Sequence, residues 1–337
     1  MSQKVTLIRG DGIGPEIVDA TVRVLEALDA GLEWEEVRAG SGAFEDLGTP
    51  LPEETLLSIA RNEVALKGPL ETPVGTGFRS INVAIRKHFD MYANVRPAQV
   101  MPGMDTRYAD TDVDMVTVRE NTEGAYAGIE HAIPPNRSAA ETIILCTRWA
   151  CERIVRYGFE YAKRTGRQKI TLVHKANILK ETNGLFLEVG QSIAREYDEI
   201  DFEDLIVDNM CMQMVMQPER FDVIVTTNLF GDILSDLAAG LIGGLGLTPG
   251  ANIGKEASMF EAVHGTAPDI AGQGVANPTA LMRAAVMMLD HLDKQEESKR
   301  LATAIDAVLT AGETVTGDLG GSATTEEFTD AVIAKLG

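Results

Sequence analysis

Short apolar runs typical of β-strands alternate with helical patterns along most of this 337-residue chain. The strand-like runs are residues 5–8, 64–67, 92–95, 114–118, 170–174, 205–207 and 223–226. Helical periodicity is clear over residues 139–165 and 182–196, and it dominates the last third, over 278–292, 296–311 and 325–335. Because helices that alternate with strands cover the faces of a largely parallel sheet, the sequence predicts an α/β fold.

The chain is longer than a usual single domain, yet no proline-rich or Gly/Ser-rich linker interrupts it. Two lobes that share one continuous sheet therefore fit the pattern better than two separate domains. The most apolar stretch, residues 237–247, is rich in glycine and far shorter than the ~20 residues that a membrane-spanning helix needs.

Acidic side chains outnumber basic ones by 51 to 30, which gives a formal net charge of −21. This charge argues against generic binding to nucleic acid or to an anionic membrane, and an anionic substrate would need positive charge gathered locally. The three cysteines, Cys146, Cys151 and Cys211, form no CxxC pair and no cluster with histidine, so structural zinc is disfavoured. We expect a soluble, cytoplasmic protein with reduced thiols.

A glycine turn follows the first predicted strand and resembles a dinucleotide-binding loop. It reads Gly10-Asp-Gly12-Ile-Gly14, but Pro15 stands where the fingerprint needs its third glycine. The turn is therefore interpreted as structural, with Pro15 suited to the first turn of the following helix.

Two aspartates in the segment NLFGDILSD (228–236) form the strongest local signal. If a helix begins near Gly231, Asp232 and Asp236 are i,i+4 neighbours on one face, and their like charges repel. A hard cation held by carboxylate oxygens would compensate this repulsion, and Asp208 could supply a third carboxylate. The alternative is a solvated acidic face, although apolar residues flank the segment.

Arg86, Arg96 and Arg119 each follow an apolar run, where open α/β sheets gather ligands. Guanidinium groups suit carboxylates, so the three arginines indicate a polycarboxylate site, whereas each one alone could be a salt-bridge partner. Lys175, directly after a strand, could act as a base or form a structural ion pair. Tyr126 could serve in acid catalysis or in core packing. His264 could stack as an aromatic ring on a ligand.

Several segments of the chain resemble the β-decarboxylating dehydrogenases, which comprise isocitrate, homoisocitrate and 3-isopropylmalate dehydrogenases. The segments are GDGIGPEI (10–17), YANVRP (92–97), VRENTEGAY (118–126), HKAN (174–177), VDNMCMQMV (207–215), TTNLFGDILSDLAAGLIGGLGL (226–247), HGTAPDIAG (264–272) and DLGGSATTEEF (318–328). Together they span nearly the whole chain.

The resemblance implies a two-lobed, non-Rossmann α/β fold with a shared sheet. The large, NAD-binding domain would comprise residues 1–92 and 243–337, and the small domain residues 93–242, with a dimer clasp around 125–148. In this family the catalytic lysine and one metal-binding aspartate cross from the neighbouring subunit. The active unit would therefore be a homodimer or a higher homo-oligomer.

The resemblance also assigns site residues. The catalytic residues would be Tyr126, Lys175 and Asp208, and the ligands of Mg²⁺ or Mn²⁺ would be Asp208, Asp232 and Asp236. The substrate contacts would be Thr72, Ser80, Asn82, Arg86, Arg96 and Arg119. The NAD contacts would be His264, Gly265, Thr266, Ala267, Asp269, Ile270 and Asn277.

The choice of substrate depends on Ser80 and Asn82, which are similar to the residues that bind a carboxylate of isocitrate in isocitrate dehydrogenases. An isopropyl group would leave these polar atoms unpaired, at a cost of roughly 1–3 kcal/mol per group. Homoisocitrate keeps the carboxylate and adds one methylene, so it is the closer competitor. Glu71 departs from the threonine that is frequent in isocitrate dehydrogenases, and Arg9 stands where relatives often have proline.

Asp269 and Ile270 indicate NAD, because NADP-dependent members resemble one another in carrying lysine and tyrosine there. An aspartate can accept hydrogen bonds from both ribose hydroxyls and would repel a 2′-phosphate. The closest resemblance is thus to NAD-dependent isocitrate dehydrogenases. The alternative to an enzyme is a regulatory subunit that lacks activity. Such a subunit is expected to have lost catalytic or metal-binding side chains, whereas this chain keeps them.

Overall fold

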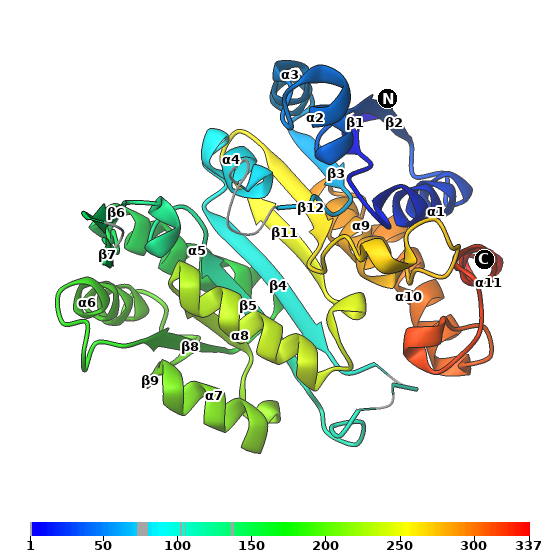
Figure 1. Ribbon diagram of the computed structural model, residues 1–337. Helices are drawn as coiled ribbons and strands as arrows, with labels where there is room; N and C mark the ends of the chain where they lie inside the picture. Colours follow the sequence, from blue (N-terminus) through cyan, green and yellow to red (C-terminus); the bar gives the residue numbers. More distant parts are fainter. Residues whose placement is uncertain (1, 73–79, 102, 105, 136–137) are drawn as a thin grey trace. The chain divides into compact units, whose positions relative to one another are not determined.

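The computed structural model describes residues 2–72, 80–101, 103–104, 106–135 and 138–337 (Figure 1). The chain divides into two compact units. Unit 1 comprises Met1–Phe89, Val100–Asp110 and Ala239–Gly337, and unit 2 comprises Asp90–Gln99 and Thr111–Ala238. Among the described residues, no helix has the length and apolarity needed to cross a membrane.

Unit 1 is built from both ends of the chain. Its elements are β1 (Gln3–Ile8), α1 (Gly14–Ala27), β2 (Leu32–Val37), α2 (Ser41–Leu47), α3 (Glu53–Asn62), β3 (Val64–Lys67), α4 (Ile81–His88), β11 (Pro249–Ile253), β12 (Ser258–Ala262), α9 (Thr279–His291), α10 (Gln295–Ala311) and α11 (Thr325–Ala334), with short 3-10 turns at Leu245–Leu247, Pro268–Ile270 and Gly317–Leu319. Its strands run in the order β2-β1-β3-β12-β11, and only the β11–β12 pair is antiparallel.

The apolar helix α9 packs on β12 and β11, and α1 packs against α9 and α11. All four residues of β3 are buried, as expected of a central strand covered on both faces.

Unit 2 comprises the middle of the chain. Its elements are β4 (Ala93–Gln99), β5 (Asp114–Glu120), a 3-10 turn (Ala125–Ala127), β6 (Glu130–Ile133), β7 (Ala139–Thr142), α5 (Arg148–Thr165), β8 (Lys169–His174), α6 (Thr182–Ala194), β9 (Asp201–Ile206), α7 (Val207–Met216), a second 3-10 turn (Pro218–Arg220), β10 (Val223–Thr226) and α8 (Asn228–Leu241). Five of its described strands run in the order β4-β5-β10-β8-β9, in which β4–β5 is antiparallel and the other pairs are parallel, and β6 and β7 form a separate antiparallel pair. Helix α5 packs on β5, β10 and β8.

The predicted α/β class and mainly parallel pairing are confirmed. The predicted helix over residues 139–165 is wrong in its first part, because 139–142 pair with β6 in an exposed two-stranded hairpin. The helix begins only at Arg148, where the Thr147 hydroxyl accepts a hydrogen bond from the Ala150 N–H and caps it.

Residues 100–110 group with unit 1, whereas the sequence-based division places them in the middle segment. The Thr106 hydroxyl donates to the Leu241 carbonyl at 2.6 Å, and Gly103 lies against the backbone of Leu309. These contacts tie the segment to helices from the carboxyl-terminal third. The functions predicted for the two domains stay predictions.

Candidate active site

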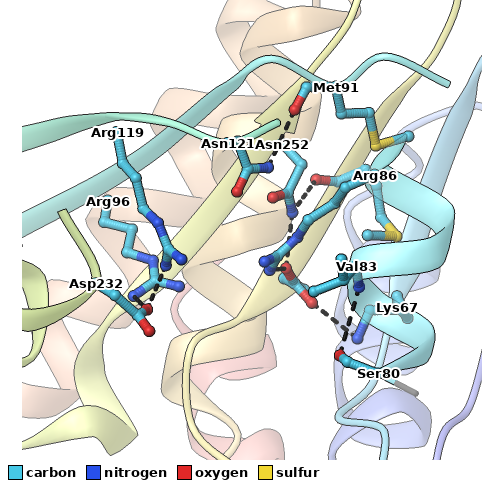
Figure 2. Close-up of polar contacts among 12 residues, drawn as sticks. Lys67, Ser80, Val83, Arg86, Met91, Arg96, Arg119, Asn121, Asp232 and Asn252 are labelled. Carbon is cyan, nitrogen blue, oxygen red and sulfur yellow. Dashed lines mark hydrogen bonds and ion pairs between the residues drawn. The ribbon is translucent and has the colours of Figure 1, made fainter. Parts of the chain in front are cut away.

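In unit 2, two buried arginines converge on one aspartate (Figure 2). Arg96 lies on β4 and Arg119 on β5, and the antiparallel register places them diagonally on the same face of the sheet. Arg119 forms an ion pair with Asp232, and the Arg96 Nη1 lies 3.3 Å from Asp232 Oδ1. The sequence predicted each of these residues in a site, and the structure brings the three together.

The first turn of α8 fixes the position of Arg119 through two residues that sequence reasoning missed. The Asn228 Oδ1 accepts hydrogen bonds from Nε and Nη2 of Arg119, at 3.1 and 2.7 Å. A Cβ on Gly231 would lie 2.5 Å from Cγ of Arg119, so only glycine lets the helix approach this closely. Both residues lie in the segment 228–236, where the sequence pattern assigns a role only to Asp232 and Asp236.

Tyr126 belongs to the same cluster, because its hydroxyl donates to Asp232 Oδ2 at 2.5 Å. The Arg119 guanidinium carbon lies 5.0 Å from the centre of the Tyr126 ring. Burial, together with the carboxylate of Asp232, raises the pKa of Tyr126 above its usual value. The phenol therefore keeps its proton at neutral pH.

Asp232 and Asp236 lie one turn apart on α8, as predicted. Burial favours the neutral form of Asp232, but Arg119, the Tyr126 hydroxyl and Arg96 outweigh burial and lower its pKa. Burial raises the pKa of Asp236, and the neighbouring charge of Asp232 raises it further against the opposing effect of Arg96. Asp236 is thus the carboxylate with less compensating positive charge around it.

Lys175 and Asp208 pair with each other within this chain. Lys175 follows β8, Asp208 lies in the first turn of α7 after the neighbouring strand β9, and the two side chains form an ion pair. The hydrogen bond from Lys175 is the main reason why the pKa of Asp208 is lowered. The side chain of Asp208 is 69% exposed, and within the described ranges no three acidic, histidine or cysteine side chains form a metal-binding group. A single copy therefore presents two of the three predicted metal ligands together.

In unit 1, Arg86 lies in a buried charge network (Figure 2). Its Nη2 donates to Glu261 Oε1 at 2.7 Å, the Lys67 ammonium lies 2.8 Å from Glu261 Oε2, and the Asn252 amide donates to Glu261 Oε1. Burial opposes ionisation of Glu261, but the charges of Lys67 and then Arg86 lower its pKa far below the usual value. Sequence reasoning missed Glu261 and its two other partners, Lys67 and Asn252.

Ser80 caps α4, since its hydroxyl accepts a hydrogen bond from the Val83 N–H, and it lies 3.4 Å from the Thr72 hydroxyl. The Asn82 Oδ1 and the Arg86 Nε are buried polar atoms without a hydrogen-bond partner in the described part of the chain. Such atoms suit a polar ligand. Residues 73–79 of the predicted substrate loop lie outside the described residues.

A second feature of unit 1 is a cavity of about 520 Å³. Five predicted NAD contacts line it: His264, Gly265, Ala267, Ile270 and Asn277. Thr266 and Asp269 do not line it; the Thr266 carbonyl is instead turned to the Ile13 N–H, and Asp269 is an exposed residue of the Pro268–Ile270 turn.

One ring nitrogen of His264 has no hydrogen-bond partner among the described residues. Its Nδ1 lies 2.9 Å from the Gly265 carbonyl, and since a carbonyl only accepts, Nδ1 carries the proton. The buried Nε2 has no partner among the described residues, and burial lowers the pKa of the ring. A neutral imidazole with a free acceptor beside a cavity of this size fits a planar base that bears an amino group.

The comparisons with known proteins agree with these features. The model of the isocitrate/isopropylmalate dehydrogenase family matches residues 4–332. A mitochondrial regulatory subunit of the NAD isocitrate dehydrogenase of Dictyostelium discoideum is 49% identical, over 99% of this chain and 92% of its own length. The catalytic subunit 5 of the NAD isocitrate dehydrogenase of Arabidopsis thaliana is 48% identical, over 98% of this chain and 88% of its own length.

An NADP isocitrate dehydrogenase of Thermus thermophilus is also 48% identical, over 99% of this chain and 68% of its own length. Among solved structures, the isocitrate dehydrogenase of Methylococcus capsulatus superimposes with a TM-score of 0.96 at 56% identity, covering 100% of this chain and 99% of that chain. The family predicted from the motifs is thus confirmed: the chain belongs to the isocitrate/isopropylmalate dehydrogenase family.

Proposed function

We propose that this protein is an enzyme that oxidises and decarboxylates isocitrate to 2-oxoglutarate and CO2, with NAD as hydride acceptor and Mg²⁺ or Mn²⁺ as metal. The observation that carries the proposal is the cluster in unit 2, where two buried arginines lie beside a proton-holding tyrosine and a pair of carboxylates. The names of the similar proteins support isocitrate as substrate. NADH formation from isocitrate tests the proposal.

The donor set fits a hard divalent cation. Asp232 and Asp236 present carboxylates from one helix face, and Asp208 of a second copy would complete the set. When bound, the metal lowers the pKa of the substrate hydroxyl and stabilises negative charge on the substrate oxygen.

The side chains of the protein have separate roles in this proposal. Arg86, Arg96 and Arg119 bind the substrate carboxylates and orient the molecule. As the neutral amine, Lys175 would accept the proton of the substrate hydroxyl group while the carbon that bears this group gives up its hydride, for which bound NAD would be the acceptor. After CO2 has left, Tyr126 supplies the proton that completes 2-oxoglutarate.

The alternative role, that of a regulatory subunit, gains support from the similarity to the Dictyostelium protein. Against it, all eight residues predicted for the metal, the substrate carboxylates and proton transfer are present: Arg86, Arg96, Arg119, Tyr126, Lys175, Asp208, Asp232 and Asp236. In unit 2, five of them contact one another in a single cluster: Arg96, Arg119, Tyr126, Asp232 and Asp236. We therefore favour the catalytic role.

We propose a homodimer as the minimum active unit. Apolar side chains are exposed on α7, where Met212, Val215 and Met216 are 49%, 50% and 66% exposed, and on α8, where Ile233 is 51% exposed. Exposed apolar side chains on the two helices that carry Asp208 and Asp232 suit contact with a second copy of the chain. In the predicted clasp, every residue of the two strands β6 and β7 is exposed. A cytoplasmic location is also proposed, on the basis of the sparse, free cysteines.

NAD is proposed over NADP because Asp269 places a negative charge on the turn beside the cavity. The Asp269→Lys variant is expected to raise the ratio of kcat/KM for NADP to that for NAD at least roughly tenfold, because a charge-assisted hydrogen bond to the 2′-phosphate replaces repulsion. Steady-state kinetics with both cofactors measure this ratio. Asp290→Lys, the same charge change at an exposed position of α9, is the control and is expected to leave the ratio unchanged. An unchanged ratio in Asp269→Lys would contradict the assignment.

A further inference from the structure

The glycine turn at residues 10–16, which the proposed function does not use, lies closely against two other segments of unit 1. Gly10 and Gly12 have φ angles of 79° and 60°. A Cβ on Gly10 would lie 2.2 Å from the Pro69 carbonyl oxygen, and a Cβ on Gly12 would lie 2.0 Å from that of Thr266. The N–H groups of Asp11 and Ile13 donate to the same two carbonyls, at 2.8 and 2.9 Å. The turn is thus fixed between two segments of unit 1. We call residues 69–72, which lead to the predicted substrate contact Thr72, the substrate segment, and residues 264–277, which hold the predicted NAD contacts, the cofactor segment.

Asp11 binds the substrate segment through its side chain. The carboxylate is buried, and its Oδ1 accepts hydrogen bonds from the Ser41 N–H and hydroxyl, at 2.9 and 2.7 Å. Its Oδ2 accepts one from the Glu71 N–H at 2.9 Å. Glu71 precedes Thr72, whose hydroxyl lies 3.4 Å from that of Ser80. Asp11 therefore holds the backbone directly before two predicted substrate contacts.

Glu16 binds the cofactor segment in the same way. Its Oε2 accepts a hydrogen bond from the Gly274 N–H at 3.2 Å, and its Oε1 accepts one from the Ala276 N–H at 2.9 Å. The Thr325 hydroxyl also donates to Oε1. Val275, between the two bonded amides, lines the 520 Å³ cavity together with the following Asn277.

We propose that Asp11 and Glu16 are positioning residues with separate targets, Asp11 for the substrate segment and Glu16 for the cofactor segment. The inference rests on the proposed function, which assigns these segments to isocitrate and NAD. Both positions need two acceptor oxygens, because donors approach both oxygens of each side chain. An amide would present an N–H group to one backbone N–H and lose that hydrogen bond.

The test compares Asp11→Asn and Glu16→Gln in steady-state kinetics of the full chain. Asp11→Asn is expected to raise the KM for isocitrate roughly ten- to hundredfold, with the KM for NAD within about twofold of wild type. Glu16→Gln is expected to raise the KM for NAD by a similar factor and to leave that for isocitrate nearly unchanged. Ser41→Ala, which keeps the backbone bond to Asp11, and Glu26→Gln, at an exposed position of α1, are the controls.

Amide hydrogen exchange provides a readout that is independent of activity. Asp11→Asn is expected to speed exchange at the Glu71 amide, and Glu16→Gln at the Gly274 amide, because the remaining oxygen of glutamine can keep the bonds to Ala276 and Thr325; each rate should rise about tenfold or more. Unchanged exchange at these amides, or an equal rise in both KM values in both variants, would overturn the inference. If the wild type does not oxidise isocitrate, the proposed function fails, while the exchange rates still decide whether the two carboxylates position these segments.

Discussion

A Lys175→Met variant is expected to lose kcat for isocitrate oxidation by about 10²–10⁴-fold, the usual contribution of a general base. The side-chain nitrogen of Lys175 pairs with Asp208. In the proposed site, this nitrogen therefore lies beside a metal ligand and the substrate hydroxyl. Methionine preserves the apolar stem and removes only the group that exchanges the proton. Initial rates of NADH formation at saturating isocitrate measure the effect.

Lys180→Met is the matched control, because Lys180 is an exposed lysine five positions further along the same connection. Its kcat is expected to stay within about twofold of wild type, as is usual for surface substitutions. A Lys175→Met enzyme with wild-type kcat would exclude Lys175 as the base. A wild-type protein without turnover would instead favour the role of a regulatory subunit.

Co-expression extends this test to the proposed sharing of sites between two copies. Lys175→Met and Asp232→Asn chains with different affinity tags allow purification of the mixed dimer. If Lys175 acts in the partner's site, one site of the mixed dimer carries both substitutions and the other carries neither. The mixed dimer is then expected to recover about half of wild-type activity. Recovery of no activity would place Lys175 and Asp232 in the same chain's site.

The second large effect is expected on stability. Glu261→Ala removes the shared partner of Lys67 and Arg86, whose side chains are 1% and 11% exposed. Two buried positive charges then lack their counter-ion, and the free energy of unfolding should fall by about 3–5 kcal/mol. Urea denaturation measures this loss. Glu256→Ala, at an exposed position between β11 and β12, is the control and is expected to change stability by less than about 0.5 kcal/mol.

The same network predicts how stability depends on pH. The folded state lowers the pKa of Glu261 below its ordinary value of 4.5, so the ionised form is favoured by folding. Its contribution is therefore fully present above pH 4.5 and is lost as the pH falls below that value. Glu261→Ala should show a weaker loss of stability in this acidic range than the wild type does. A Glu261→Ala variant as stable as wild type would show that the network does not stabilise unit 1.

The cluster in unit 2 was largely predictable, because its members carry local signals. In the sequence, Arg96 and Arg119 follow apolar runs, and Asp232 and Asp236 show helical spacing next to apolar residues. The contact between Tyr126 and Asp232 carries no local signal, and only the resemblance to the family connected the two residues.

The network of Lys67, Glu261 and Asn252 could not be predicted from local patterns. Lys67 and Glu261 are nearly two hundred positions apart, and the β3–β12 register places them opposite each other. In the sequence, Lys67 ends a short strand, a position usually exposed to solvent. Its burial depends on tertiary pairing that no periodicity encodes.

Helical periodicity misled the interpretation at residues 139–147, where residues 139–142 instead form the exposed hairpin strand β7. The Glu123 carboxylate accepts hydrogen bonds from the Thr147 N–H and hydroxyl, at 2.8 and 2.7 Å, and fixes where α5 begins. This contact comes from a distant loop, so a local pattern could not place the start of the helix.

The most direct test of the proposed function is NADH or NADPH formation by the wild-type protein with Mg²⁺. Isocitrate, homoisocitrate and 3-isopropylmalate are each compared with NAD and with NADP. The polar Ser80 and Asn82 and the acidic Asp269 predict the highest kcat/KM for isocitrate with NAD. A higher kcat/KM for homoisocitrate or 3-isopropylmalate, or for NADP as cofactor, would contradict the proposed specificity.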